Sequence, residues 1–111
     1  MALAVFVSEG RAIDYTPTTD VAAGDVVVQG ELVGIAKRPI PANTPGALAI
    51  TGVFDMPKAT GAGSGLAAGI EAFWDVANKV VTATAQNNAF LGKTVRAAAD
   101  TDVTVRVRLK Q

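Results

Sequence analysis

Between Ala23 and Lys58, glycine and proline interrupt this chain so often that a helix of ordinary length has almost nowhere to form. Apolar runs of three to five residues alternate there with breaks that contain Gly or Pro, and short apolar runs of the same β-type recur in the second half of the chain. Short runs of Val, Ile and Leu that are bounded by Gly are typical of β-strands. This pattern favours an all-β fold in which short strands are joined by Gly- and Pro-rich loops.

The apolar runs predict where the strands lie. The run at 103–109 is the clearest, because every second residue in it is Val or Leu and these side chains point to one face of a strand. No stretch keeps a helical apolar period beyond about two turns, and residues 66–68 and 97–99 are the candidates for a short helical turn. Strands that recur about every ten residues predict a small barrel or sandwich. The expected strands are 11–15, 26–28, 32–36, 47–54 with a bulge at Gly52, 70–74, 79–84, 90–96 and 103–109.

The length of the chain predicts a single β-domain spanning residues 1–111, because 111 residues are too few for two cores of ordinary size. Alanine supplies 21 of the hydrophobic residues, so the core is thinner than a hydrophobic share of 50% implies. We expect a partner subunit to cover the remaining apolar surface. Residues 1–20 carry one apolar run, at 3–7, followed by a polar stretch, and we expect them to form an extended N-terminal arm.

The charged and reactive residues argue against several classes of function. Ten basic and ten acidic side chains cancel, so no long-range field attracts nucleic acid or an anionic membrane, and we expect neither as a partner. Without His or Cys, the chain has no His-based catalytic triad, thiol nucleophile or disulfide, and no imidazole or thiolate metal site. We therefore expect no enzyme, no cofactor and no metal.

The apolar start of the chain does not predict export. It is seven residues long, follows no Lys or Arg, and is followed closely by Glu9. A signal peptide needs basic residues before its apolar run, and a membrane-spanning helix needs about 20 apolar residues. We expect a protein that is made in a cytoplasm and kept there until it assembles.

Three further patterns each have two interpretations. Asp100 and Asp102 could form a carboxylate pair for acid–base chemistry, although a polar turn is favoured because most surface acids are solvated. Residues 63–68 fit the G-x-G-x-x-A pattern, but no apolar strand precedes them, so a surface loop is favoured over a nucleotide site. Arg106, Arg108 and Lys110 form a basic stripe that could contact phosphate. An exposed edge face, or one that is charge-paired across a subunit boundary, is favoured because the net charge is zero.

Phe73 and Trp74 are the largest adjacent side chains. Neighbouring residues of a strand point to opposite faces, so one of the two is expected in the core. The other is a candidate interface anchor. Burial of both, through sheet twist or at a strand end, is the alternative.

Six segments follow one another in order along the chain: AGDVV at 23–27, LVGIA at 32–36, GVFDMPKA at 52–59, FWD at 73–75 after Gly69, FLGKT at 90–94, and the closing strand at 103–109. Taken in this order, they make the chain resemble the small capsid cement (decoration) proteins of tailed bacteriophages, from about Phe6 to Leu109. Phe73 stands where the family usually has Tyr, and the loop at 61–65 is richer in glycine than is usual.

The resemblance implies a barrel- or β-tulip-like domain with no catalytic residues. It implies a structural protein on the outer surface of the expanded icosahedral head, which stabilises the head by bridging neighbouring coat subunits, commonly as a trimer. The implied partners are further copies of the chain and the major capsid protein. The alternatives are another virion surface component, such as a head-fibre base or tail-associated protein, or a carbohydrate-binding surface module. The candidate interface residues are Leu3, Val5, Val7, Tyr15, Trp74, Arg106 and Arg108.

Overall fold

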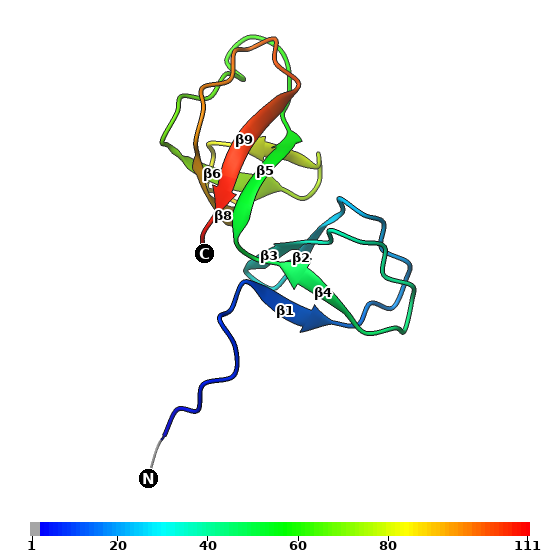
Figure 1. The fold of residues 1–111 in the computed structure, drawn as a ribbon. Coiled ribbons are helices and arrows are strands. Elements are labelled where there is room, and N and C mark those ends of the chain that lie inside the picture. Colours follow the sequence, from blue (N-terminus) through cyan, green and yellow to red (C-terminus); the bar gives the residue numbers. More distant parts are fainter. Residues whose placement is uncertain (1–2) are drawn as a thin grey trace.

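The computed structural model describes residues 3–111, which form two antiparallel β-sheets and no helix (Figure 1). The prediction of an all-β chain is confirmed. Since the described residues hold no helix, none of them lies in a helix that is long and apolar enough to cross a membrane. The candidate turns at 66–68 and 97–99 are not helical either. Instead Leu66 and Ala98 exchange two backbone hydrogen bonds of 2.8 Å and form a β-bridge.

The first half of the chain forms a four-stranded sheet, called here the small sheet (Figure 1). Its two central strands pair through Ile35 and Ala49 alone. A two-residue turn that contains Gly30 joins the edge strand at 26–29 to the central strand at 32–35. Gly30 has φ of +63°, a conformation that glycine adopts without strain. In spatial order the strands are β1 (Ala12–Tyr15), β4 (Gly46–Ala49), β3 (Leu32–Ile35) and β2 (Val26–Gln29).

The second half forms a five-stranded sheet, called here the large sheet. The predicted basic stripe lies on β9, which has a hydrogen-bonded neighbour on both sides. The prediction that the stripe lies on an edge strand is therefore wrong. In spatial order the strands are β5 (Gly52–Pro57), β9 (Thr104–Leu109), β8 (Ala89–Thr94), β6 (Glu71–Asp75) and β7 (Val80–Thr82).

The prediction of one strand over 47–54 is wrong. The chain leaves the small sheet after Ala49 and enters the large sheet at Gly52, so residues 50–51 connect two strands in different sheets. The strand irregularity lies elsewhere, in β8, where Ala72 of β6 pairs with Gly92 but the next residue pairs with Phe90. One residue of β8 is therefore left over, as in a β-bulge.

The two sheets do not close into a barrel, in contrast to the barrel part of the prediction. Each sheet keeps two edge strands, β1 and β2 in one and β5 and β7 in the other. The end of β5 meets β7 only through a single parallel bridge between Lys58 and Val81. The sheets are joined instead by a shared core, to which β3 contributes Val33 and Ile35. We call this cluster the main core. It also contains Met56, Leu66, Ala72, Trp74, Val81, Leu91, Ala98, Val105, Val107 and Leu109.

The small sheet buries side chains on both faces, which explains its uninterrupted apolar runs. In β2, Val26 and Val28 pack against the main core, whereas Val27 packs against a second cluster. This second cluster, called here the small core, contains Val21, Ala36, Ile40 and Leu48. Successive residues of a strand point to opposite faces, so a strand covered on both faces is apolar at every position.

The side-chain amide of Gln111 ties the end of β9 to the small sheet. Its Nε2 donates to the carbonyl of Val33 (2.7 Å), and its Oε1 accepts from the Val33 N–H (2.6 Å). An amide presents one donor and one acceptor, as a strand neighbour does. Gln111 thus replaces the partner that β3 loses where the chain crosses to the large sheet.

Candidate interaction surface

The N-terminal segment at 3–10 extends away from both sheets (Figure 1) and forms no strand. The chain joins the small sheet at Ala12, so residues 12–15 of the expected arm are an edge strand packed against the fold. We use "arm" below for residues 3–10 only. Its apolar side chains are almost wholly exposed, at 96% for Leu3, 79% for Val5, 77% for Phe6 and 89% for Val7.

The arm brings together three of the interface candidates, Leu3, Val5 and Val7. Phe6 lies among them and was missed by sequence reasoning. The alternation of an extended segment puts it opposite the other three, so a contact that involved one face only would not require it. Exposed apolar side chains in such a run are unfavourable in water, so the arm remains the candidate segment for contact with a partner.

The two aromatic candidates lie inside the fold and apart from the arm. Trp74 is 5% exposed and belongs to the main core, while Tyr15 is half-buried against the small core. Phe73 takes the opposite face from Trp74, as predicted for adjacent strand residues. It is half-buried against Phe90, with ring centroids 5.5 Å apart in an edge-to-face arrangement.

The two arginine candidates lie on the outer face of the large sheet. The guanidinium of Arg106 donates two hydrogen bonds to the carboxylate of Asp55 on β5, at 2.8 and 3.1 Å. These bonds lower the pKa of Asp55 below its ordinary value of 3.8 and raise the pKa of Arg106. Arg108 is exposed. The charge of Arg106 is therefore balanced within the chain, on a neighbouring strand.

The acidic and glycine-rich motifs form a structural loop. The carboxylate of Asp100 accepts hydrogen bonds from the N–H groups of Gly65 (2.6 Å) and Gly63 (3.3 Å), and that of Asp102 accepts from Ala99 N–H (2.8 Å). A Cβ at Gly65 would lie 2.7 Å from the Asp100 carboxylate. The loop at 61–65 thus needs glycine to wrap around a carboxylate. Within residues 3–111, no group of three or more acidic side chains could hold a metal ion.

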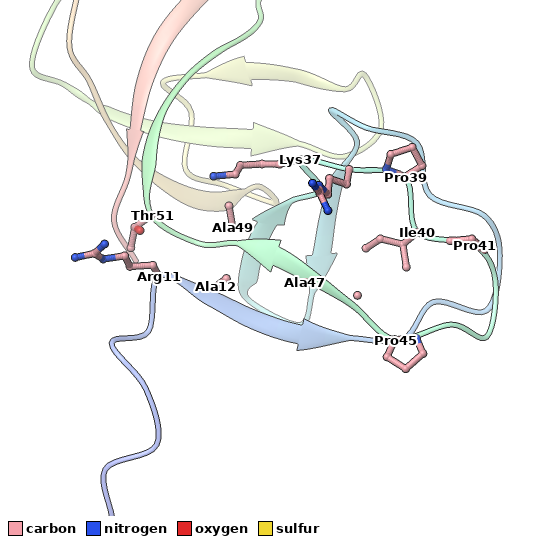
Figure 2. A pocket seen from close by; sticks show the side chains of 12 residues that line it. Arg11, Ala12, Lys37, Pro39, Ile40, Pro41, Pro45, Ala47, Ala49 and Thr51 are labelled. Carbon is pink, nitrogen blue, oxygen red and sulfur yellow. The ribbon is translucent and has the colours of Figure 1, made fainter.

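A groove of about 630 Å³ opens on the small sheet beside the base of the arm (Figure 2). Its lining combines small and rigid residues with three cations, and none of the lining residues is acidic. Figure 2 shows Arg11, Lys37 and Thr51 toward one end of the groove and Pro41 and Pro45 toward the other. The lining consists of Arg11, Ala12, Lys37, Arg38, Pro39, Ile40, Pro41, Pro45, Gly46, Ala47, Ala49 and Thr51.

The seven predicted interface residues therefore occupy four separate places: the arm, the main core, the edge of the small core and the outer face of the large sheet. The groove contains none of them. Its cations come from two separate stretches of sequence, which is why no single motif indicated it. The prolines at 39, 41 and 45 interrupt the apolar runs in the sequence, but no local pattern shows that they form a groove wall.

Comparison with known proteins identifies the family. A family model described as phage cement protein matches residues 7–109, a span that includes all the strands of both sheets. No curated protein and no solved structure matches the chain. The family is one of structural capsid proteins, so its members are located in the virion capsid. It is not a known enzyme family. From residue 7 to residue 109, the chain belongs to the phage cement protein family.

Proposed function

We propose that this protein binds the outer surface of the expanded icosahedral head as a trimer and stabilises the head by bridging neighbouring coat subunits. The family match supports the capsid role. The exposed arm is the observation that carries the proposal furthest, because four large apolar side chains within five residues lie in water in the isolated chain. The protein would be made in the cytoplasm of the bacterial host and assemble from there.

The stabilisation follows from mass action. A ligand that binds only the expanded shell favours that shell over any state that lacks the binding site. A trimer presents three linked contacts, so modest affinity at each contact becomes tight overall binding. Packaged DNA presses on the shell from inside, and a protein that joins adjacent coat subunits resists their separation.

The arm is suited to contact the coat protein. Eight extended residues reach about 26 Å from the small sheet. The arm lacks regular structure and has unpaired backbone groups, so it is able to add a strand to an exposed sheet edge of the coat protein. Leu3, Val5 and Val7 would then fill pockets on one side of that strand.

The proposal is tested by mixing the purified protein with expanded heads that lack it. We expect the protein to sediment with the heads and to raise the temperature at which they release their DNA. Sedimentation equilibrium of the free and eluted protein measures whether it is a trimer. If the protein stays in the supernatant at saturating concentration, the proposed function is wrong.

The contribution of the arm is tested by deleting residues 3–10. The deletion stops before β1, whose Ile13 and Tyr15 pack against the small core, so the fold is retained. We expect head binding to be lost, while thermal unfolding of the free protein is unchanged. A matched variant that replaces Leu3, Val5 and Val7 with Ser keeps the arm length and should lose binding as well. If the deletion variant decorates heads normally, the arm is not a binding element.

A further inference from the structure

The groove lies where the small sheet is incomplete. The Ile50 N–H donates to the Arg11 carbonyl (3.1 Å), and hydrogen-bonded pairs alternate with non-hydrogen-bonded pairs along an antiparallel ladder. The pair of Arg11 and Ile50 is thus a hydrogen-bonded one. The register pairs Asp14 with Ala47, three positions along the ladder from that pair, so Asp14 and Ala47 form a non-hydrogen-bonded pair. The N–H and C=O of Ala47 therefore point away from β1, toward the side where β3 lies.

The strand β3 does not reach Ala47. Its pairing with β4 consists of Ile35 opposite Ala49, and the chain then bends at Lys37 and Arg38. Among the described residues, no turn or loop hydrogen bond involves the backbone of Ala47. Both of its polar backbone groups thus face the groove, where they resemble a short open sheet edge.

The wall opposite Ala47 is held rigidly. Ile40 exchanges two backbone hydrogen bonds with Val21, at 2.8 and 2.9 Å, and its side chain belongs to the small core. The Asn43 N–H donates to the Pro17 carbonyl (2.7 Å). The prolines at 39 and 41 on either side of Ile40 fix their own φ angles. The groove is therefore preformed, and a ligand would not have to order it.

The charge of the groove is uncompensated. Arg11, Lys37 and Arg38 line it without an acidic neighbour in the lining. The one ion pair within 4.0 Å in the described part of the chain joins Arg106 to Asp55, so none of the three groove cations has a carboxylate partner. The remainder of the lining is mainly Ala and Pro, which offers apolar contact without bulk.

We propose that this groove binds an extended, acidic segment of the coat protein. The segment pairs its backbone with Ala47, as in β-strand addition, and places carboxylates against Lys37, Arg38 and Arg11. The identity of the partner rests on the proposed function, but the chemistry of the ligand does not. A peptide is favoured over single-stranded nucleic acid because the groove has no aromatic side chain in its lining for a base to stack on.

A peptide-binding experiment tests the groove without the head. The probe is a fluorescein-labelled peptide of alternating Val and Glu, and its anisotropy is measured with the full-length protein at low salt. We expect saturable binding, weakened about tenfold or more in a Lys37→Glu/Arg38→Glu variant. The matched control, Lys79→Glu/Lys93→Glu, makes the same change of charge at exposed positions of the large sheet and should bind as the wild type does.

Three results would overturn the inference in this experiment. The wild-type protein fails to bind the acidic peptide, or it binds a matched peptide of Val and Lys equally well. In the third, a labelled single-stranded DNA binds more tightly than the acidic peptide, with the same dependence on Lys37 and Arg38. Thermal unfolding of each variant establishes that it is folded before binding is measured.

The expanded head provides the second test. Head binding by Lys37→Glu/Arg38→Glu should weaken about tenfold, with a smaller dependence on salt than in the wild type, while the control on the large sheet binds normally. If the groove variant binds heads as the wild type does, the groove inference is wrong and the proposed function stands. If the wild-type protein does not bind heads, the proposed function fails instead, and the peptide result still decides the chemistry of the groove.

Discussion

At the scale of single residues, Gly92 marks a close approach of β8 to β9. Its φ is +151°, and a Cβ placed there would collide with the carbonyl oxygen of Arg108 and lie 2.8 Å from the N–H of Lys110. We expect Gly92→Ala to lower the free energy of unfolding by about 3 kcal/mol, because backbone atoms of β9 would have to move. Urea unfolding followed by fluorescence measures the loss.

The matched control for that substitution is Gly61→Ala. Gly61 also has positive φ, at +117°, but nothing lies within 4 Å of a Cβ built there. The free energy of unfolding of this variant should fall only by the cost of placing Ala in a positive-φ conformation, about 1–2 kcal/mol. Equal losses at the two positions would mean that the contact with β9 has no energetic consequence.

Gln111 takes the place of a strand neighbour of Val33. Removing its side chain should destabilise the protein more than the loss of a polar side chain near the surface usually does. Val33 is 0% exposed, so its N–H and C=O have no access to water once the amide is gone. We expect Gln111→Ala to destabilise the protein by about 2 kcal/mol and to speed hydrogen exchange at Val33. Lys110→Ala, at an exposed neighbouring position, should leave both quantities unchanged.

At this scale, the sequence predicted the chemical character of single residues better than it predicted which residues surround them. It placed Phe73 and Trp74 on opposite faces, but both are large and apolar, so only the packing shows that Trp74 is the buried one. It recognised Arg106 as part of a basic stripe, yet the partner Asp55 lies on a strand 51 residues away in sequence. The groove was missed because its open edge depends on where β3 stops pairing, which no local pattern encodes.

At the scale of elements, the short apolar runs predicted nearly every strand. Their main failure was at 47–54, where the break at Thr51 and Gly52 was interpreted as a bulge within one strand, although the chain passes there from one sheet to the other. Local propensity describes how a residue fits a strand, not which sheet the strand joins. The same limit explains the barrel prediction, because closure depends on edge pairing between distant strands.

The turn between β6 and β7 gives a pH-dependent prediction. The Asp75 carboxylate accepts from the Asn78 side-chain amide (2.8 Å) and from the backbone N–H groups of Asn78 and Ala77. These bonds, the Asn78 amide first, lower the pKa of Asp75 below 3.8. The stabilisation is therefore fully present above pH 3.8 and is lost as the pH falls through the lowered value in the folded protein.

We expect Asp75→Asn to be less stable than the wild type at neutral pH and equally stable in acid. The thermal midpoints of the two proteins, measured from neutral pH down to about pH 2, should converge below pH 3.8. Asn78→Ala keeps the carboxylate but removes its strongest partner, so its midpoint should converge with that of the wild type in the same range. A constant difference between wild type and Asp75→Asn at all pH values would contradict the assignment.

At the scale of the whole molecule, the two sheets share one core although each also has its own edges. Val33 and Ile35 belong to the small sheet but pack into the main core with residues of the large sheet. The small core lies on the opposite face of the same small sheet. Loss of either core therefore exposes the strand that supports the other, and we predict that residues 12–111 unfold as one cooperative unit.

The chain carries one Trp and one Tyr, which report on different cores. Trp74 lies in the main core and Tyr15 packs against the small core, so Trp74 fluorescence and the NMR ring signals of Tyr15 follow them separately. Both probes should give the same urea midpoint. Ile35→Ala and Leu48→Ala, one in each core, should each lower the stability by about 3 kcal/mol and move both probes together. Separate midpoints, or a Leu48→Ala effect seen by Tyr15 alone, would show two independent folding units.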